Sequence, residues 1–146
     1  MTAGQTALLV IPTDHLPRAA AIHAWIRGAL GNLPAPARLH AAVVTSELVT
    51  TARRLGRPPY VLQLTVVDYP DRADHGLLVT VDDCTPELPA SLDADLILVR
   101  ALSRRWGVDR RVAAKSVWAE LAFDAGRITL TTPDHPARNP RTGRER

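Results

Sequence analysis

The segment from Ala35 to Leu55 carries the longest helical pattern in the chain, and it limits the available folds more than any other feature. Its apolar residues recur at three- and four-residue spacing, and Gly56 followed by two prolines ends the pattern. The residues expected along its apolar side are Leu39, Val43, Val44, Leu48 and Leu55. A helix with one apolar side needs another layer of structure to cover that side. The rest of the chain is therefore expected to provide such a layer.

Strand-like segments on both sides of this helix are expected to form the second layer. Gln5 to Ile11 predicts a first strand at the edge of a sheet, and Pro17 to Leu30 predicts another amphipathic helix. After the long helix, residues 62–66 alternate between apolar and other positions, and Leu77 to Val81 is a second apolar run. A polar turn separates these two runs, so they predict an antiparallel pair of strands.

The C-terminal half predicts one more helix and a hairpin. Leu96 to Trp106 has a helical pattern that ends at Gly107. Ser116–Phe123 and Arg127–Thr131 predict two strands joined by a turn at residues 124–126. The resulting order is strand, helix, helix, strand, strand, helix, strand, strand. We therefore expect an α+β fold, a two-layer sandwich with a mainly antiparallel sheet and three helices on one face.

The chain of 146 residues has room for one domain, which we place at residues 1–132. Residues 133–146 are rich in proline and arginine and are expected to form a disordered basic tail. The net charge is +3, and the tail carries four arginines against two acidic residues, so the body is close to neutral. This distribution argues against a nucleic-acid partner. A nucleic-acid binder, as another class of function, would have to act through the tail.

Several features of the sequence point to a cytoplasmic protein without a membrane or metal site. No apolar run approaches the roughly 20 residues that a membrane-spanning helix requires, and the first five residues lack the basic and apolar blocks of a secretion signal. Cys84 is the single cysteine, which fits a reducing compartment. The five histidines are scattered, with no pair at metal-ligand spacing inside one element, so we expect no metal site.

Four short segments, taken in order, resemble the motifs of one protein family. They are residues 47–50 (ELVT), 80–86 (TVDDCTP), 96–107 (LILVRAL followed by WG) and 115–121 (KSVWAEL). Over roughly residues 17–123 the chain is similar to the histidine-kinase-like ATPase domains of the anti-sigma-factor serine kinase type, especially the small actinobacterial ones. The resemblance implies the Bergerat, or GHKL, ATP-binding fold, which agrees with the element order above.

Glu47 is the catalytic residue that the resemblance implies. In the family, a glutamate here is the general base toward a partner's serine hydroxyl, and an asparagine four residues later holds the magnesium that bridges the ATP phosphates. Thr51 takes the asparagine position but has no amide carbonyl, so it is a degenerate cofactor ligand. The four-residue spacing puts Glu47 and Thr51 on one helix face. By spacing alone, a solvated helix residue also explains Glu47.

Asp83 and Ser116 are the nucleotide-binding residues that the resemblance implies. In the family, an aspartate followed by glycine accepts a hydrogen bond from the adenine amino group, and a threonine hydroxyl completes the contact through water. Asp83 matches the aspartate, Cys84 replaces the glycine, and Ser116 keeps a hydroxyl at the threonine position. The adenine end of a nucleotide site is thus partly retained.

The phosphate end of the family's site has no counterpart in this sequence. Family members carry a glycine-rich lid before the third helix, whose backbone amides hold the phosphates. Residues 89–96 contain no glycine and include Asp93 and Asp95, whose carboxylates would repel a triphosphate. The connection is also shorter than the usual lid.

These departures predict a regulatory protein-binding module of the anti-sigma-factor type, a degenerate and non-catalytic pseudokinase in transcription regulation that needs no cofactor. Its expected partner is a sigma factor or a STAS-domain anti-anti-sigma factor. A homodimer is compatible with the resemblance. The alternative is an active serine kinase that uses ATP and magnesium to phosphorylate a STAS-domain antagonist, with Glu47 as its base.

Overall fold

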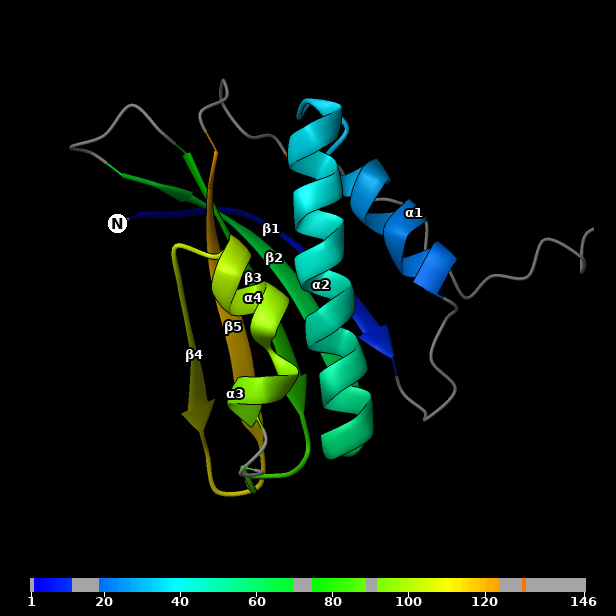
Figure 1. The fold of residues 1–146 in the computed structure, drawn as a ribbon, viewed down its shortest axis with the longest axis vertical. Helices are drawn as coiled ribbons and strands as arrows, with labels where there is room; N and C mark the ends of the chain where they lie inside the picture. Colours follow the sequence, from blue (N-terminus) through cyan, green and yellow to red (C-terminus); the bar gives the residue numbers. More distant parts are fainter. Residues whose placement is uncertain (1, 12–18, 70–74, 89–91, 124–129, 131–146) are drawn as a thin grey trace, which may run out of the picture.

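The computed structural model describes residues 2–11, 19–69, 75–88, 92–123 and 130. They form an α+β fold that Figure 1 shows as a sheet beside a group of helices. The elements in chain order are β1 (Thr2–Ile11), α1 (Ala19–Ala29), α2 (Ala35–Leu55), β2 (Tyr60–Asp68), β3 (His75–Asp83), α3 (Leu92–Asp95), α4 (Ile97–Leu102), β4 (Arg105–Arg110) and β5 (Lys115–Phe123).

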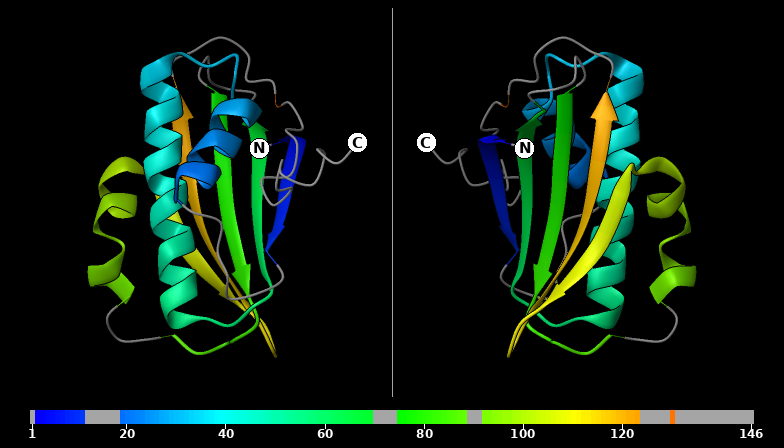
Figure 2. Two further views of the ribbon diagram at one scale, coloured as in Figure 1. Left: turned by 90° about the vertical axis from the view of Figure 1, so that its right-hand side faces the viewer. Right: turned by 90° about the vertical axis from the view of Figure 1, so that its left-hand side faces the viewer.

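The five strands form one sheet in the order β1-β2-β3-β5-β4, and every neighbouring pair is antiparallel. Figure 2 shows the helices grouped on one side of this sheet, while no helix of the described residues covers the other side. This arrangement is compatible with the predicted two-layer sandwich. The described residues contain four helices instead of three, because α3 and α4 are separate short helices.

The core lies between the sheet and the helices, with buried side chains from α1, α2 and α4. Leu62 and Leu64 of β2 pair with Val81 and Val79 of β3, and all four side chains are buried. Leu48 of α2 is also buried in this cluster. Side chains alternate between the two faces of a strand, so the intervening residues of β2 and β3 point away from the helices.

Most sequence predictions for the first half of the chain are confirmed. α2 has the predicted bounds, β1 lies at an end of the sheet, and β2 and β3 form an antiparallel pair. The helix predicted over residues 17–30 is observed as α1. One detail is wrong, because Leu39 was expected on the apolar side of α2 and is instead 62% exposed. Among the described helices none is both long and apolar enough to cross a membrane.

The prediction of one helix over Leu96 to Trp106 is wrong at its C-terminal end. α4 ends at Leu102, and residues 105–110 form the edge strand β4, which pairs with β5. Trp106 and Val108 both pack against the core, at the two-residue spacing of a strand. Leu102, the last residue of α4, and Trp106 of β4 are four positions apart. This spacing also fits one longer helix, so the sequence pattern did not show where the helix ends.

The second predicted hairpin falls largely outside the described residues. Ser116–Phe123 is confirmed as a strand within β5, but the turn at residues 124–126 and most of the strand at Arg127–Thr131 are not described. Leu130 is described and is not part of a strand, and its backbone N–H donates to the Gln5 side chain with an N–O distance of 2.8 Å. The predicted tail at residues 133–146 also lies outside the described part of the chain.

Candidate functional site

Glu47 lies on α2 and its carboxylate contacts the start of α4. Its Oε1 atom accepts a hydrogen bond from the backbone N–H of Leu98, with an N–O distance of 3.2 Å. The first N–H groups of a helix have no partner within that helix, and the residue before α4, Leu96, provides no side-chain cap. Glu47 therefore caps α4 from the neighbouring helix.

Two further polar contacts fix α3 and α4 to α2. Arg54 Nη2 lies 2.8 Å from Asp95 Oδ1, an ion pair between α2 and α3. His40 Nε2 lies 2.8 Å from the carbonyl oxygen of Leu102, the last residue of α4, so this ring nitrogen is the donor. Together with Glu47, these residues hold both ends of α4 and the end of α3.

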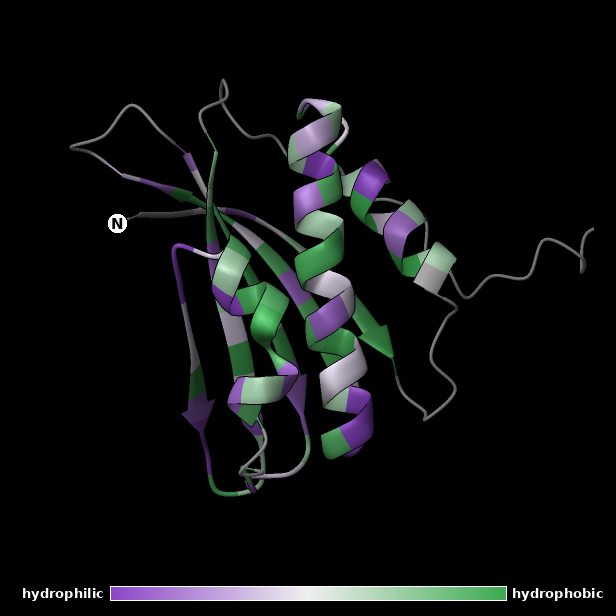
Figure 3. Ribbon diagram, viewed as in Figure 1, coloured by the Kyte–Doolittle hydropathy of each residue, from purple (hydrophilic) through white to green (hydrophobic). Residues whose placement is uncertain are grey.

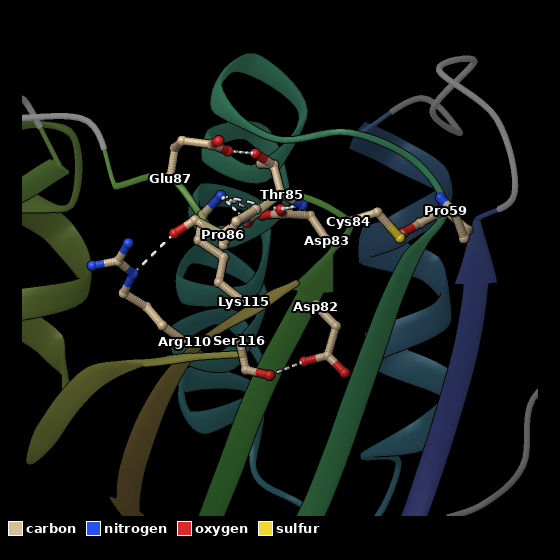
Figure 4. Close-up of polar contacts among 10 residues, drawn as sticks. All are labelled: Pro59, Asp82, Asp83, Cys84, Thr85, Pro86, Glu87, Arg110, Lys115 and Ser116. Carbon is tan, nitrogen blue, oxygen red and sulfur yellow. Dashed lines mark hydrogen bonds and ion pairs between the residues drawn. The ribbon is translucent and has the colours of Figure 1, made fainter. Parts of the chain in front are cut away.

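Asp83 lies at the end of β3 and forms a buried ion pair with Lys115 (Figure 4). The exposed fraction is 1% for Asp83 and 2% for Lys115. Lys115 Nζ donates to Asp83 Oδ1 at 3.1 Å and to the carbonyl oxygen of Thr85 at 3.1 Å, and it lies 3.0 Å from Asp83 Oδ2. The backbone N–H of Thr85 also donates to Asp83 Oδ1 at 2.9 Å. Oδ1 is thus held by two hydrogen bonds, whereas the buried Oδ2 accepts none in the described part of the chain and meets the ammonium as an ion pair only.

The end of α2 covers this ion pair. A Cβ atom added at Gly56 would lie 2.5 Å from Asp83 Cγ, so the glycine allows the backbone to approach the carboxylate closely. Thr51, one turn earlier in α2, is 5% exposed. Gly56 and Asp83 thus meet where the end of α2 approaches the end of β3.

Ser116 lies on the opposite face of the sheet from Asp83. β3 and β5 pair with Asp83 opposite Lys115 and with Asp82 opposite Ser116. The Ser116 hydroxyl donates to the Asp82 carboxylate and accepts a hydrogen bond from Arg111 Nη2 at 3.2 Å. Figure 4 shows Ser116 and Asp82 pointing away from the Lys115–Asp83 pair. The structure therefore does not bring Ser116 to Asp83.

Lys115 is the residue of this site that sequence reasoning missed. It is the single lysine of the chain and directly precedes Ser116. A lone lysine among seventeen arginines was a usable signal, because a lysine ammonium fits a compact buried site better than a forked guanidinium does. The register that places it opposite Asp83 could not be deduced from strand alternation alone.

The loop after β3 is held by one arginine side chain and by a backbone hydrogen bond to the segment after α2. Arg110 Nε donates to the carbonyl oxygen of Pro86 at 3.0 Å, and Cys84 N–H donates to the carbonyl oxygen of Arg57 at 2.9 Å. The Thr85 hydroxyl donates to the Glu87 carboxylate, and this hydrogen bond lowers the pKa of Glu87 below its ordinary value. Cys84 itself is exposed.

Three large apolar side chains on α2 and α4 are exposed, and together we call them the α2–α4 surface. It consists of Leu39 on α2 and Ile97 and Leu98 on α4, with exposed fractions of 62%, 63% and 48%. Leu98 does not pack into the core, and the next residue, Val99, is fully buried there instead. Figure 3 shows the hydrophobic character of α4 beside the mixed surface of α2.

Comparisons with known proteins name no family for this chain. No protein-family model matches the sequence, and no curated protein matches it. Within the described residues, no group of three or more His, Cys, Asp or Glu side chains could hold a metal ion. The functional argument therefore rests on the geometry of Glu47, Asp83 and Lys115.

Proposed function

We propose that this protein is a cytoplasmic, regulatory protein-binding domain of the anti-sigma-factor type, with a Bergerat ATPase fold that does not transfer phosphoryl groups. The observation that carries the proposal is the buried ion pair between Asp83 and Lys115. In the resembled family, the carboxylate at this position accepts a hydrogen bond from the adenine amino group. Here the Lys115 ammonium is already paired with that carboxylate.

The burial of the pair makes displacement by a nucleotide costly. Separating one partner from a buried ion pair leaves an uncompensated charge, at a cost of about 3–5 kcal/mol. The amino group of adenine is neutral and would replace a charge-assisted hydrogen bond with a weaker one. An adenine that replaced Lys115 at Asp83 Oδ1 would therefore lose an interaction stronger than the one it forms. Asp83 Oδ2 accepts no hydrogen bond in the described part of the chain, but it is fully buried and lies 3.0 Å from the ammonium.

The contacts of Glu47 also favour a structural role over a catalytic one. A general base must reach the hydroxyl proton of its substrate, whereas one Glu47 oxygen accepts the Leu98 N–H and caps α4. Thr51 is buried and has no amide carbonyl to hold magnesium. The contacts of Glu47 and the burial of Thr51 thus support a domain that does not transfer phosphoryl groups.

The α2–α4 surface supports protein binding as the remaining activity. Leu39, Ile97 and Leu98 are exposed on two helices that contact each other, and large exposed apolar side chains are a feature of protein interfaces. Two polar contacts from α2 hold α4 in place and a third holds α3, which reduces the entropy lost when a partner binds. The proposed partner is a sigma factor or a STAS-domain anti-anti-sigma factor.

The test compares two substitutions of Glu47 with the wild type. Glu47→Gln keeps an oxygen that accepts the Leu98 N–H but cannot act as a base, whereas Glu47→Ala removes both functions. Each protein is incubated with labelled ATP, magnesium and a candidate STAS-domain partner, and both label transfer and complex formation are measured.

We expect no label transfer by any of the three proteins. Complex formation should be equal for wild type and Glu47→Gln and weaker for Glu47→Ala, because loss of a helix cap costs about 0.5–2 kcal/mol and loosens α4. Transfer by the wild type that falls about 10²–10⁴-fold in both variants would instead establish the kinase alternative.

A further inference from the structure

The side of the sheet that faces away from the helices contains a hollow of about 480 Å³. Its lining comes from β2, β3, β4 and β5 and the turn after β4, on the side that faces the viewer in the right-hand panel of Figure 2. The lining includes Gln63, Leu78, Thr80, Arg111, Ser116 and Trp118. A volume of this size is within the range of small-molecule sites, and the mixture of apolar and polar side chains is typical of them.

Trp118 provides an aromatic surface in this hollow. It pairs across the strands with Gly107, and a Cβ atom added at Gly107 would lie 2.7 Å from Cζ2 and 2.9 Å from Cε2 of the indole. The ring therefore lies across the glycine on β4. Trp118 is only partly buried, so an aromatic ligand could stack on the indole or meet its edge.

Arg111 provides a positive charge beside that surface. Its guanidinium donates to the Ser116 hydroxyl at 3.2 Å, and Ser116 in turn donates to Asp82. Among the described residues, no carboxylate lies within ion-pair distance of Arg111. By contrast, the other arginine of the hollow, Arg105, is paired with Glu120 at 2.7 Å, and this hydrogen bond raises the pKa of Arg105 above its ordinary value.

We propose that this hollow binds a small planar aromatic anion. The aromatic ring would contact Trp118, and the carboxylate or phosphate of the ligand would bind the guanidinium of Arg111, which presents several N–H donors in one plane. Thr80 and Gln63 offer hydroxyl and amide groups to the ring substituents, and Asp109, also in the lining, can accept an N–H or O–H. This site lies across the sheet from Asp83 and is independent of the proposed function.

The first experiment measures binding by titration calorimetry to the full chain. The two anionic probes are indole-3-acetate, an aromatic carboxylate, and uridine monophosphate, an aromatic phosphate, so the comparison shows which anion the site takes. Cyclohexylacetate controls for the aromatic ring and tryptamine for the sign of the charge. We expect a submillimolar dissociation constant for at least one anionic probe and binding at least about tenfold weaker for both controls.

The second experiment uses matched arginine variants. Arg111→Gln should weaken binding of the preferred probe by about tenfold or more, because it removes the charge and keeps most of the side-chain length. Arg110→Gln is the control, since its Nε atom contacts Pro86 away from the hollow, and it should bind like the wild type. Trp118→Leu should also weaken binding, and circular dichroism would show whether it folds.

Three results would overturn this site. They are no binding of either anion at millimolar concentration, equal binding of tryptamine and indole-3-acetate, and an unchanged dissociation constant in Arg111→Gln. Binding of a short single-stranded oligonucleotide when both small anions fail would also overturn it, in favour of a nucleic-acid surface.

Discussion

Lys115 reaches Asp83 because the register of β3 and β5 places these two residues opposite each other on the helix-facing side of the sheet. A shift of one residue would place Ser116 there and turn Lys115 toward solvent. One lysine at this position therefore changes what the carboxylate can bind. The neighbouring pair of Asp82 and Ser116 is directed to the other face, where it supports Arg111.

Substitution of Lys115 should show how strongly Asp83 depends on it. Lys115→Met should lower the free energy of unfolding by about 3–5 kcal/mol, because Asp83 would be left buried without its counter-charge. The double variant Asp83→Asn with Lys115→Met should recover most of this loss, since the asparagine oxygen can still accept the Thr85 N–H. Urea denaturation of both variants measures the two values.

A double variant no more stable than Lys115→Met alone would contradict this account. It would mean that the lysine stabilises the protein through packing of its methylene chain rather than through the charge of Asp83. The comparison depends on unchanged m values, which indicate that both variants unfold from similarly compact states.

At the residue level, the sequence predicted some positions of the candidate site and missed others. Asp83 and Thr51 were expected near a ligand, and both are buried around the end of α2. Ser116 was expected beside Asp83, but it lies opposite Asp82. Which residue of β5 faces Asp83 depends on the register of the two strands, and the alternation of apolar residues did not determine that register to within one position. Family resemblance located the segment, but the pairing of strands determined which side chain faces the carboxylate.

At the level of elements, α4 is held in position by contacts that no sequence pattern reveals. Glu47 binds its first turn and His40 its last residue, although their partners lie 51 and 62 positions away along the chain. Long-range side-chain contacts with backbone groups do not produce a periodic signal. The strand β4 was missed for a related reason, because local spacing alone could not distinguish its apolar residues from a continuation of α4.

The orientation of α4 leads to a prediction that uses two adjacent residues. Val99→Ala should lower the free energy of unfolding by about 2 kcal/mol, because Val99 is fully buried and its loss leaves a cavity. Leu98→Ala should change stability by no more than about 0.5 kcal/mol, because Leu98 is 48% exposed. Thermal or urea unfolding of the two variants provides the measurement.

The variants Leu98→Ala and Val99→Ala also test whether the α2–α4 surface is a docking site. Leu98→Ala should weaken the complex with a STAS-domain or sigma-factor partner while the protein stays folded. Equal losses of stability in Leu98→Ala and Val99→Ala would show that α4 is rotated relative to this structure. Unchanged partner binding in Leu98→Ala would place the partner elsewhere.

At the level of the whole molecule, the sheet divides the protein into two sides with different chemistry. The helix side contains the buried Lys115–Asp83 pair and the exposed α2–α4 surface, and the other side contains the hollow around Trp118. The two-layer arrangement could be predicted because helix and strand periods appear directly in the sequence. The strand order β1-β2-β3-β5-β4 depends on contacts between distant segments, and local patterns do not encode it.

Titration calorimetry of the wild-type protein with ATP and magnesium is the most direct test of whether Lys115 takes the place of a nucleotide at Asp83. We predict no heat beyond that of dilution at physiological, millimolar ATP, because the Asp83 carboxylate is already paired and Thr51 supplies no magnesium ligand. A micromolar dissociation constant that weakens when magnesium is chelated would contradict this account and establish a working nucleotide site.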